Sequence, residues 1–179
     1  MKFDARFGSK HGKLYALKTG EEADTGALIP FDSSVLADAS SVSAEAEAQR
    51  FSQDRGKILA VYVPLRTAEI SENTYDEMYL AALRMFLKGV EAYGAYAVVV
   101  PISDCSAERV TQAMCHTARR IKDCAAVIGF AIPDALTESE ATTFTEAMSA
   151  KHAHYVYFSN RHTLSSFVAY AVESGRGQS

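Results

Sequence analysis

Polar side chains that could bind a ligand or transfer a proton follow the apolar runs of the sequence. The candidate ligand-binding residues are Asp32, Arg66, Ser103, Asp134, Asn160 and Arg161, and the candidate catalytic residues are Asp104, Asp134 and His162. Arg66 and Arg161 could bind a carboxylate or phosphate, because a guanidinium matches the geometry of both groups. Asp104, Asp134 and His162 could exchange protons or form hydrogen bonds with sugar hydroxyls. All of them also fit a structural role, since polar residues begin loops and stand near helix starts.

Other reactive groups lack the neighbours that their chemistry requires. Cys105 lies near a predicted helix N-terminus, where a thiolate would be stabilised. His152 and His154 could form a metal pair, but they precede the predicted fifth strand, at the opposite end from the other candidates, with no third ligand nearby. The sequence has no Gly-x-Ser-x-Gly, Gly-x-Gly-x-x-Gly or Walker-type motif. We therefore expect no metal and no nucleotide or other cofactor.

The elements that must position these residues recur with a nearly constant period. Pro30, Pro64, Pro101 and Pro133 each stand at or near the end of an apolar run, roughly 32 to 37 residues apart, and a fifth run covers 154–159. This period fits a strand followed by a crossover helix. Proline suits the end of a strand because it cannot donate a hydrogen bond to the sheet. The runs are nearly continuous, as in parallel strands that are covered on both faces.

Helical patterns fill the intervals between the runs. The predicted helices cover residues 43–53, 75–92, 107–122, 138–150 and 163–173. Asn73 or Thr74 is the predicted N-cap of the second helix, and Ser106 that of the third. Thr137 and Glu140 form a capping box for the fourth. The alternation of strands and helices predicts an α/β protein with a parallel sheet.

We predict one domain over residues 1–179. It consists of an N-terminal hairpin within 1–20, with its turn at His11 and Gly12, about five βα units over 27–174, and a tail at 175–179. Five units make a half or partial TIM-type barrel or, alternatively, an open doubly wound sheet, because a complete barrel takes about 250 residues. In either form the carboxyl ends of the strands, and with them the candidate residues, meet at one edge.

Composition and charge argue against several classes of partner. Eighteen Lys and Arg against 22 Asp and Glu give a net charge of −4, so we expect neither nucleic acid nor a membrane surface as partner. No apolar run approaches a membrane span, and the first residues do not resemble a signal peptide. Three cysteines do not suggest a disulfide framework, which favours a reducing compartment. A cytoplasmic protein is expected.

Several stretches, taken together, resemble the N-terminal part of family 5 glycoside hydrolases, the cellulase-like barrels. Residues 10–14 are similar to the hairpin that precedes the first strand of that family. Residues 75–100 resemble its second helix and third strand, and residues 144–159 its fourth helix and fifth strand. The segment 118–135, with Val-Ile-Gly-Phe-Ala-Ile-Pro-Asp, is similar to the entry into the fourth strand and its end. The resemblance implies a barrel scaffold.

The same resemblance implies that the catalytic groups of the family are lost. Asp134, Ala135 and Leu136 stand where the family has Asn-Glu-Pro with its acid/base glutamate. Tyr62 takes the place of its second-strand arginine, and Ile102 lies near the place of its third-strand histidine. The nucleophile belongs to a seventh strand, beyond the five predicted units. Since this mechanism needs two carboxylates about 5–5.5 Å apart, we expect no such hydrolase.

Two functional hypotheses follow. The first is a non-catalytic, degenerate glycoside-hydrolase-like half-barrel that oligomerises or binds a carbohydrate or other small polar ligand. Two unpaired sheet edges would favour a homodimer. The alternative is a small α/β enzyme that uses Arg66, Asp104, Asp134 and His162 on a small polar substrate. Their geometry distinguishes the two, because an enzyme needs these four side chains in one pocket.

Overall fold

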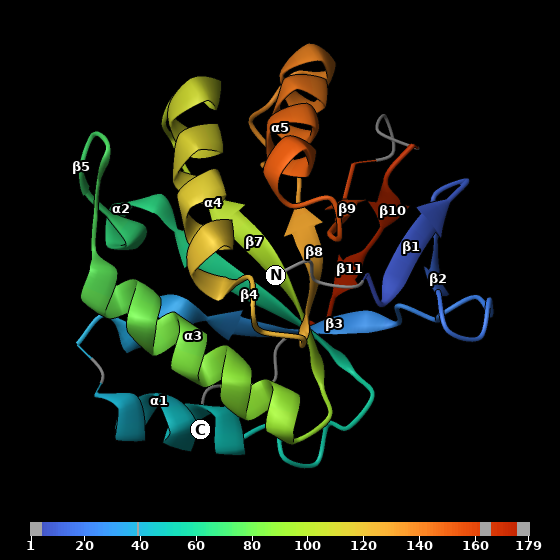
Figure 1. The fold of residues 1–179 in the computed structure, drawn as a ribbon, viewed down its shortest axis with the longest axis horizontal. Helices are drawn as coiled ribbons and strands as arrows, with labels where there is room; N and C mark the ends of the chain where they lie inside the picture. The colour runs from blue at the N-terminus through green and yellow to red at the C-terminus, as the bar shows by residue number, and fades with distance from the viewer. Residues whose placement is uncertain (1–4, 39, 162–165, 175–179) are drawn as a thin grey trace.

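The computed structural model describes residues 5–38, 40–161 and 166–174, and its core is a parallel sheet with helices outside it (Figure 1). Seven parallel strands lie in these residues, in the spatial order β10-β9-β8-β7-β4-β3-β11. They are β3 (Ala27–Asp32), β4 (Ile58–Pro64), β7 (Tyr96–Ile102), β8 (Val127–Ala131), β9 (Val156–Ser159), β10 (Val168–Ala169) and β11 (Ala171–Val172). The helices between them are η1 (Ser33–Leu36), α1 (Ser41–Gln49), α2 (Leu65–Ala68), α3 (Glu77–Ala92), α4 (Ala107–Ile121) and α5 (Glu138–Lys151).

The last two strands bring the sheet close to a closed barrel. β10 pairs with β9, β11 pairs with β3, and Tyr170 alone separates β10 from β11 along the chain. One short segment therefore pairs with both edges of the remaining sheet. The prediction of a partial TIM-type barrel is confirmed, and the alternative of an open doubly wound sheet is not what the chain forms.

The predicted helix over residues 163–173 is wrong where the structure describes it, because residues 168–169 and 171–172 are strands. The physical reason is the period of the apolar residues. Val168 is buried, Ala169 is exposed and Tyr170 is half-buried, so the side chains alternate as in a strand. The βα repeat that predicts a helix here ends before residue 168, where the apolar residues begin to alternate with a period of two.

Both edges of the sheet formed by β3, β4, β7, β8 and β9 are paired with a further strand, so unpaired edges no longer argue for a homodimer. That prediction assumed two unpaired strands, whereas β9 and β3 each have a neighbour in the structure. The dimer itself stays a prediction, and the molar mass in solution, measured by light scattering against 19.4 kDa for one chain, tests it.

The interior of the barrel is filled by side chains and closed at its amino end. Its core takes alternate residues of successive strands, among them Leu28, Ala60, Val98 and Phe158. β1 (Phe7–Lys10) and β2 (Lys13–Ala16) form an antiparallel hairpin with its turn at His11 and Gly12. This hairpin adds the buried Leu14 to the interior core, and the Phe7 ring meets the Tyr96 ring edge to face at 5.1 Å.

The outer face of the sheet packs against the helices. Phe31 of β3 stacks on Phe86 of α3 with the ring centroids 4.0 Å apart, and Phe51 meets both rings edge to face. The capping predictions for α4 and α5 are confirmed, with Ser106 as N-cap of α4 and a complete capping box at the start of α5.

The predicted start of the second helix is wrong. α3 begins at Glu77, and its N-cap is Asp76, whose carboxylate accepts hydrogen bonds from the Met78 and Tyr79 amides. Thr74 and Tyr75 form β6, which pairs with β5 (Glu69–Ser71) in a hairpin. Asn73 stands in the turn of that hairpin with a positive φ of 61°, a conformation that asparagine tolerates better than most residues.

A glycine allows two strands to approach closely at a bulge. The pairing of β7 with β8 shifts register between Ala97 and Val98, so that Val98 lies opposite Gly129. A Cβ atom on Gly129 would lie 1.7 Å from the carbonyl oxygen of Val156 on β9. The backbone of β9 therefore occupies the space that any side chain at position 129 would need.

No helix in the described parts of the chain is long and apolar enough to cross a membrane.

Candidate functional site

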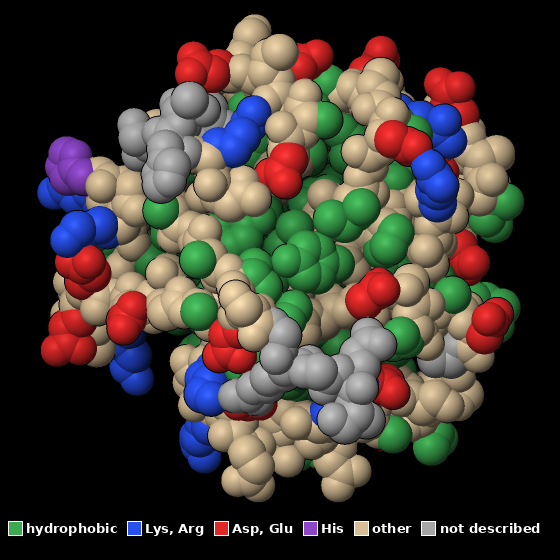
Figure 2. Space-filling view, turned by 180° about the vertical axis from the view of Figure 1, so that it is seen from behind, with side chains coloured by type: hydrophobic (Ala, Val, Ile, Leu, Met, Phe, Trp, Pro, Cys, Tyr) green, Lys and Arg blue, Asp and Glu red, His purple; other side chains and the backbone are tan. Residues whose placement is uncertain are grey.

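The mouth of the barrel at the carboxyl ends of the strands holds a cavity of about 320 Å³. Its walls include Tyr62, Ile102, Asp134, Asn160 and Tyr170. The face seen from behind relative to Figure 1 has hydrophobic side chains gathered in a hollow near its middle, with acidic side chains around them (Figure 2). Parallel barrels commonly bind their ligands at this end, so this cavity is the candidate site.

Two tyrosines and one carboxylate dominate the electrostatics of the cavity. Burial raises the pKa of Tyr62, and the negative charge of Asp134 raises it further. Burial also raises the pKa of Tyr170 well above its ordinary value, with Asp134 as the next cause and Tyr62 after it. Both phenols therefore stay protonated and can donate a hydrogen bond. Asn160 Nδ2 lies 3.5 Å from Asp134 Oδ2, which keeps the amide beside the carboxylate.

Buried hydrogen bonds fix the strand that carries Tyr62. Ser33 Oγ donates to the Tyr62 carbonyl oxygen at 2.5 Å. Because the Ser33 proton is used there, the Tyr79 hydroxyl donates to Ser33 Oγ, also at 2.5 Å. Asp32 caps η1, since its carboxylate accepts a hydrogen bond from the Ser34 amide at 2.9 Å. The ends of β3 and β4 are thus held together behind the cavity.

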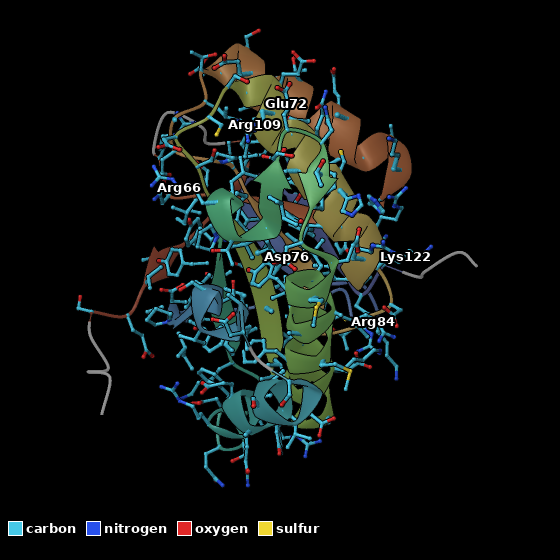
Figure 3. The ribbon with its side chains drawn as sticks, turned by 90° about the vertical axis from the view of Figure 1, so that its left-hand side faces the viewer. Arg66, Glu72, Asp76, Arg84, Arg109 and Lys122 are labelled. Atoms are coloured by element: carbon cyan, nitrogen blue, oxygen red, sulfur yellow. The ribbon has the colours of Figure 1, made fainter. Side chains whose placement is uncertain are left out.

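Arg66 and Asp104 lie outside the cavity and pair with each other. Their ion pair is exposed, with side-chain exposures of 81% and 66%. The Arg66 guanidinium holds the pKa of Asp104 below its usual value, mainly through this hydrogen bond. Figure 3 shows Arg66 on the opposite side of the molecule from Arg84 and Lys122, which stand near the amino ends of the strands. The rim therefore carries two separate groups of candidate residues rather than one cluster.

The remaining candidates make local backbone contacts. Ser103 Oγ accepts from the Cys105 amide at 3.0 Å. The Arg161 side chain donates to the Leu136 carbonyl oxygen at 2.5 Å, and its backbone amide donates to Ser159 Oγ at 3.1 Å. His162 lies outside the described residues. Of the eight predicted site residues, the structure thus brings Asp134 and Asn160 together in the cavity.

Sequence reasoning did not identify Tyr62 and Tyr170 as site residues. Tyr62 alternates with Ile58 and Ala60 on the inward face of β4, and this alternation is the signal that could have found it. Tyr170 falls within the predicted helix over residues 163–173, which is wrong at this position. The signal that could have found it is the alternation of Val168, Tyr170 and Val172, which all pack on the interior core.

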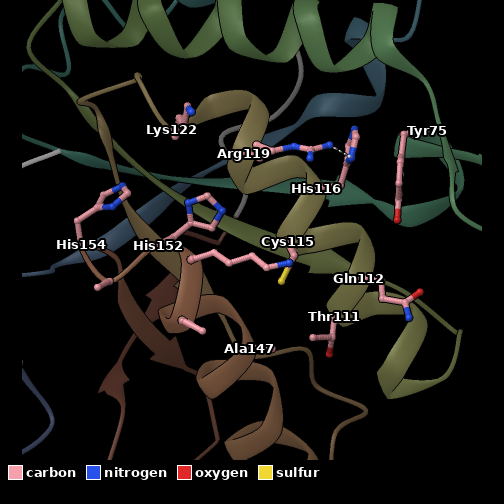
Figure 4. Close-up of a pocket in the computed structure, with 13 residues that line it drawn as sticks. Tyr75, Thr111, Gln112, Cys115, His116, Arg119, Lys122, Ala147, His152 and His154 are labelled. Carbon is pink, nitrogen blue, oxygen red and sulfur yellow. Dashed lines mark hydrogen bonds between the residues drawn. The ribbon is translucent and has the colours of Figure 1, made fainter. Parts of the chain in front are cut away.

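A second, larger hollow of about 1080 Å³ lies outside the barrel between α4 and α5 (Figure 4). His152 and His154, the possible metal pair, line it with their ring centroids 6.3 Å apart. Within the described part of the chain, no three His, Cys, Asp or Glu side chains gather closely enough to hold a metal ion. We refer to this hollow as the α4–α5 groove.

His152, which is buried, and His154, which is partly buried, are expected to make the stability of the chain depend on pH. Burial lowers the pKa of both His152 and His154 below 6.5, and His154, Lys122 and Lys151 lower that of His152 further, while the Cys115 backbone raises it. The unfolded chain therefore takes up these protons at higher pH than the folded chain does. The free energy of unfolding is expected to be constant just above pH 6.5 and to fall as the pH drops below 6.5.

Chemical denaturation at a series of pH values from 7.5 to about 5 measures this dependence. In the double variant His152→Gln/His154→Gln the slope over this range is expected to flatten, whatever the absolute stability of the variant. An unchanged slope would contradict the assignment, because carboxylates titrate mainly at lower pH.

No protein-family model and no curated protein sequence matches the chain. Solved structures match its fold. A "GH5_18" from Bifidobacterium longum subsp. infantis has a TM-score of 0.56 at 10% identity, over 74% of this chain and 42% of that one. The exo-beta-1,4-mannosidase Op5Man5 from Opitutaceae bacterium strain TAV5 has a TM-score of 0.62 at 12% identity, over 84% of this chain and 34% of that one. A third structure, named as a glycoside hydrolase, has a TM-score of 0.58 at 13% identity, over 87% of this chain and 40% of that one.

The chain thus spans less than half the length of each of these three structures. At such low identity the likeness concerns the fold and not the chemistry. It agrees with the scaffold that the sequence resemblance implied. The chain has the fold of part of a glycoside-hydrolase barrel of the GH5 type.

Proposed function

We propose that this chain binds a small polar ligand, a carbohydrate in the first place, in the cavity at the barrel mouth and does not hydrolyse it. The observation that carries the proposal is the composition of the cavity wall. Two tyrosines, Tyr62 and Tyr170, stand there beside Asp134 and Asn160. Aromatic rings offer apolar faces to the C–H groups of a sugar, while the carboxylate, the amide and the phenols offer hydrogen bonds to its hydroxyls.

The same wall argues against hydrolysis by the usual pair of carboxylates. Among the described residues that line the cavity, Asp134 is the one carboxylic acid. Retaining and inverting glycosidases both need a second carboxyl group across the scissile bond. Asp104 does not supply it, because it is engaged with Arg66 outside the cavity. Binding without turnover is the activity that this wall supports.

Titration calorimetry with mannobiose and cellobiose tests the proposal. Mannobiose is included because one matching structure is an exo-beta-1,4-mannosidase. Tyr170→Ala is expected to weaken binding about tenfold or more, since it removes one aromatic wall, while Tyr170→Phe keeps most of the affinity. Asp104→Asn is the matched control, because it changes a carboxylate of the same rim outside the cavity, and it is expected to leave binding unchanged.

A lack of binding by any glycan on an array would contradict the proposal, as would equal losses in the Tyr170 and Asp104 variants. Release of reducing sugar by the purified protein, abolished by Asp134→Asn, would instead support the alternative of a small α/β enzyme. That alternative has little support from the geometry, because Arg66 and Asp104 do not line the cavity that holds Asp134.

A further inference from the structure

The α4–α5 groove is lined by an unusual excess of positive charge for a protein with a net charge of −4. Arg119 and Lys122 come from the end of α4, and Lys151 comes from the end of α5. Figure 4 shows Arg119 on α4 and Lys122 at its C-terminal end, with His152 and His154 on the segment that follows α5. No Asp or Glu is among the described residues that line this groove.

Within the described ranges, the carboxylates near the groove pair with other groups. No described residue forms an ion pair with Lys122 or Lys151. Glu77, at the edge of the groove, already binds Arg120 and His116. Arg119 donates to Nδ1 of His116 at 3.0 Å, so His116 is a neutral imidazole that donates from Nε2 to Glu77.

A smaller hollow of about 360 Å³ continues this positive surface, since Lys122 and His154 line both hollows and Arg6 lines the smaller one. Asp123 also lines it, but both of its carboxylate oxygens accept hydrogen bonds from Arg84. The two hollows together therefore present four cationic side chains, Arg6, Arg119, Lys122 and Lys151, beside the imidazole rings of His152 and His154.

We propose that the α4–α5 groove binds a small ligand that carries several phosphate groups or comparable oxyanions. The volume of the groove suits an organic molecule rather than a single ion. Hydroxyl and amide groups of Thr111 and Gln112 stand on the same wall and can bind the uncharged part of such a ligand. Bound phosphates would offset the positive charges of Lys122 and Lys151, which both lie close enough to His152 to lower its pKa.

This site is independent of the proposed function at the barrel mouth. Lys122 stands on the opposite side of the molecule from Arg66 (Figure 3). No residue of the cavity wall at the mouth lines the groove. A ligand of the groove could therefore bind whether or not the mouth holds a sugar.

Titration calorimetry of the whole chain with tripolyphosphate, at constant ionic strength, tests the inference. One saturable site is expected, with weaker binding of inorganic phosphate. The double variant Lys122→Gln/Lys151→Gln is expected to bind tripolyphosphate at least ten times more weakly. The matched control Lys10→Gln/Lys18→Gln removes two exposed charges from the hairpin region and is expected to change affinity less than twofold.

Histidine ring signals in NMR spectra locate the site directly. Tripolyphosphate is expected to shift the signals of His152 and His154 and to leave that of His11, in the hairpin turn, unchanged. The inference is overturned if no saturable binding occurs, if both double variants lose affinity equally, or if the His152 and His154 signals do not move.

Discussion

Gly129→Ala is expected to lower the free energy of unfolding by about 3 kcal/mol or more, one of the largest effects of any single substitution in this chain. The new Cβ atom would lie 1.7 Å from the Val156 carbonyl oxygen and 2.7 Å from its carbonyl carbon. Both atoms belong to the backbone of β9, which cannot move aside as a side chain can. Either β9 separates from β8, or the bulge between β7 and β8 is lost.

Urea denaturation followed by circular dichroism measures this effect, and Gly8→Ala is the matched control. Gly8 also lies in a strand, but there the new Cβ would approach the end of the exposed Leu17 side chain at 2.9 Å, which can rotate away. The control is expected to lose less than about 1 kcal/mol. Equal stabilities of the two variants would show that β8 and β9 are not packed as described.

Val168→Asp is expected to destabilise the barrel by a similar amount, about 3 kcal/mol or more. Val168 is 2% exposed and faces the interior core, so the substitution removes apolar burial and leaves a carboxylate there without a cation. Loss of the last strand would leave β3 and β9 with unpaired edges. Unpaired edges associate with other chains, so the variant is also expected to aggregate as its concentration rises.

Ala169→Asp is the matched control, because Ala169 is the next residue of the same strand and its side chain is exposed. Denaturation and light scattering should show a stable, unchanged protein in this variant. If Val168→Asp fails to fold, Val168→Ala gives a graded measurement, with an expected loss of about 2 kcal/mol. A Val168→Ala variant as stable as the parent would contradict closure of the barrel by this strand.

Elements with strong local signals could be predicted from the sequence. The apolar runs around Pro64 and Pro101 are long enough to form β4 and β7, and the side chains of Ser106 and Thr137 fix the starts of α4 and α5 through hydrogen bonds within one turn. These features depend on neighbours in the chain, which a sequence displays directly. The likeness to GH5 structures also follows from them, because the order of such elements defines the scaffold.

The composition of the mouth depends on distant contacts that local patterns do not reveal. Tyr170 reaches the cavity because two residues on each side of it pair with strands from opposite edges of the sheet. Such short pairings carry almost no signal of their own. Likewise, the pairing of Arg66 with Asp104, 38 residues apart in the chain, takes both side chains out of a common site with Asp134. The sequence predicts that these residues lie at the carboxyl ends of the strands, but the side-chain contacts determine which of them line the cavity.

Closure by the last strand has a consequence for biosynthesis. β11 pairs with β3 through Ala171 with Ala27 and Val172 with Leu28. During synthesis β3 therefore leaves the ribosome long before the segment that pairs with it. Until then β3 has a free edge, and the nascent chain resembles a half-open sheet that other chains or a chaperone can contact. Contacts between such distant residues form slowly. We expect the rate-limiting step of folding to be the insertion of Val168, Tyr170 and Val172, after the helices and central strands have formed.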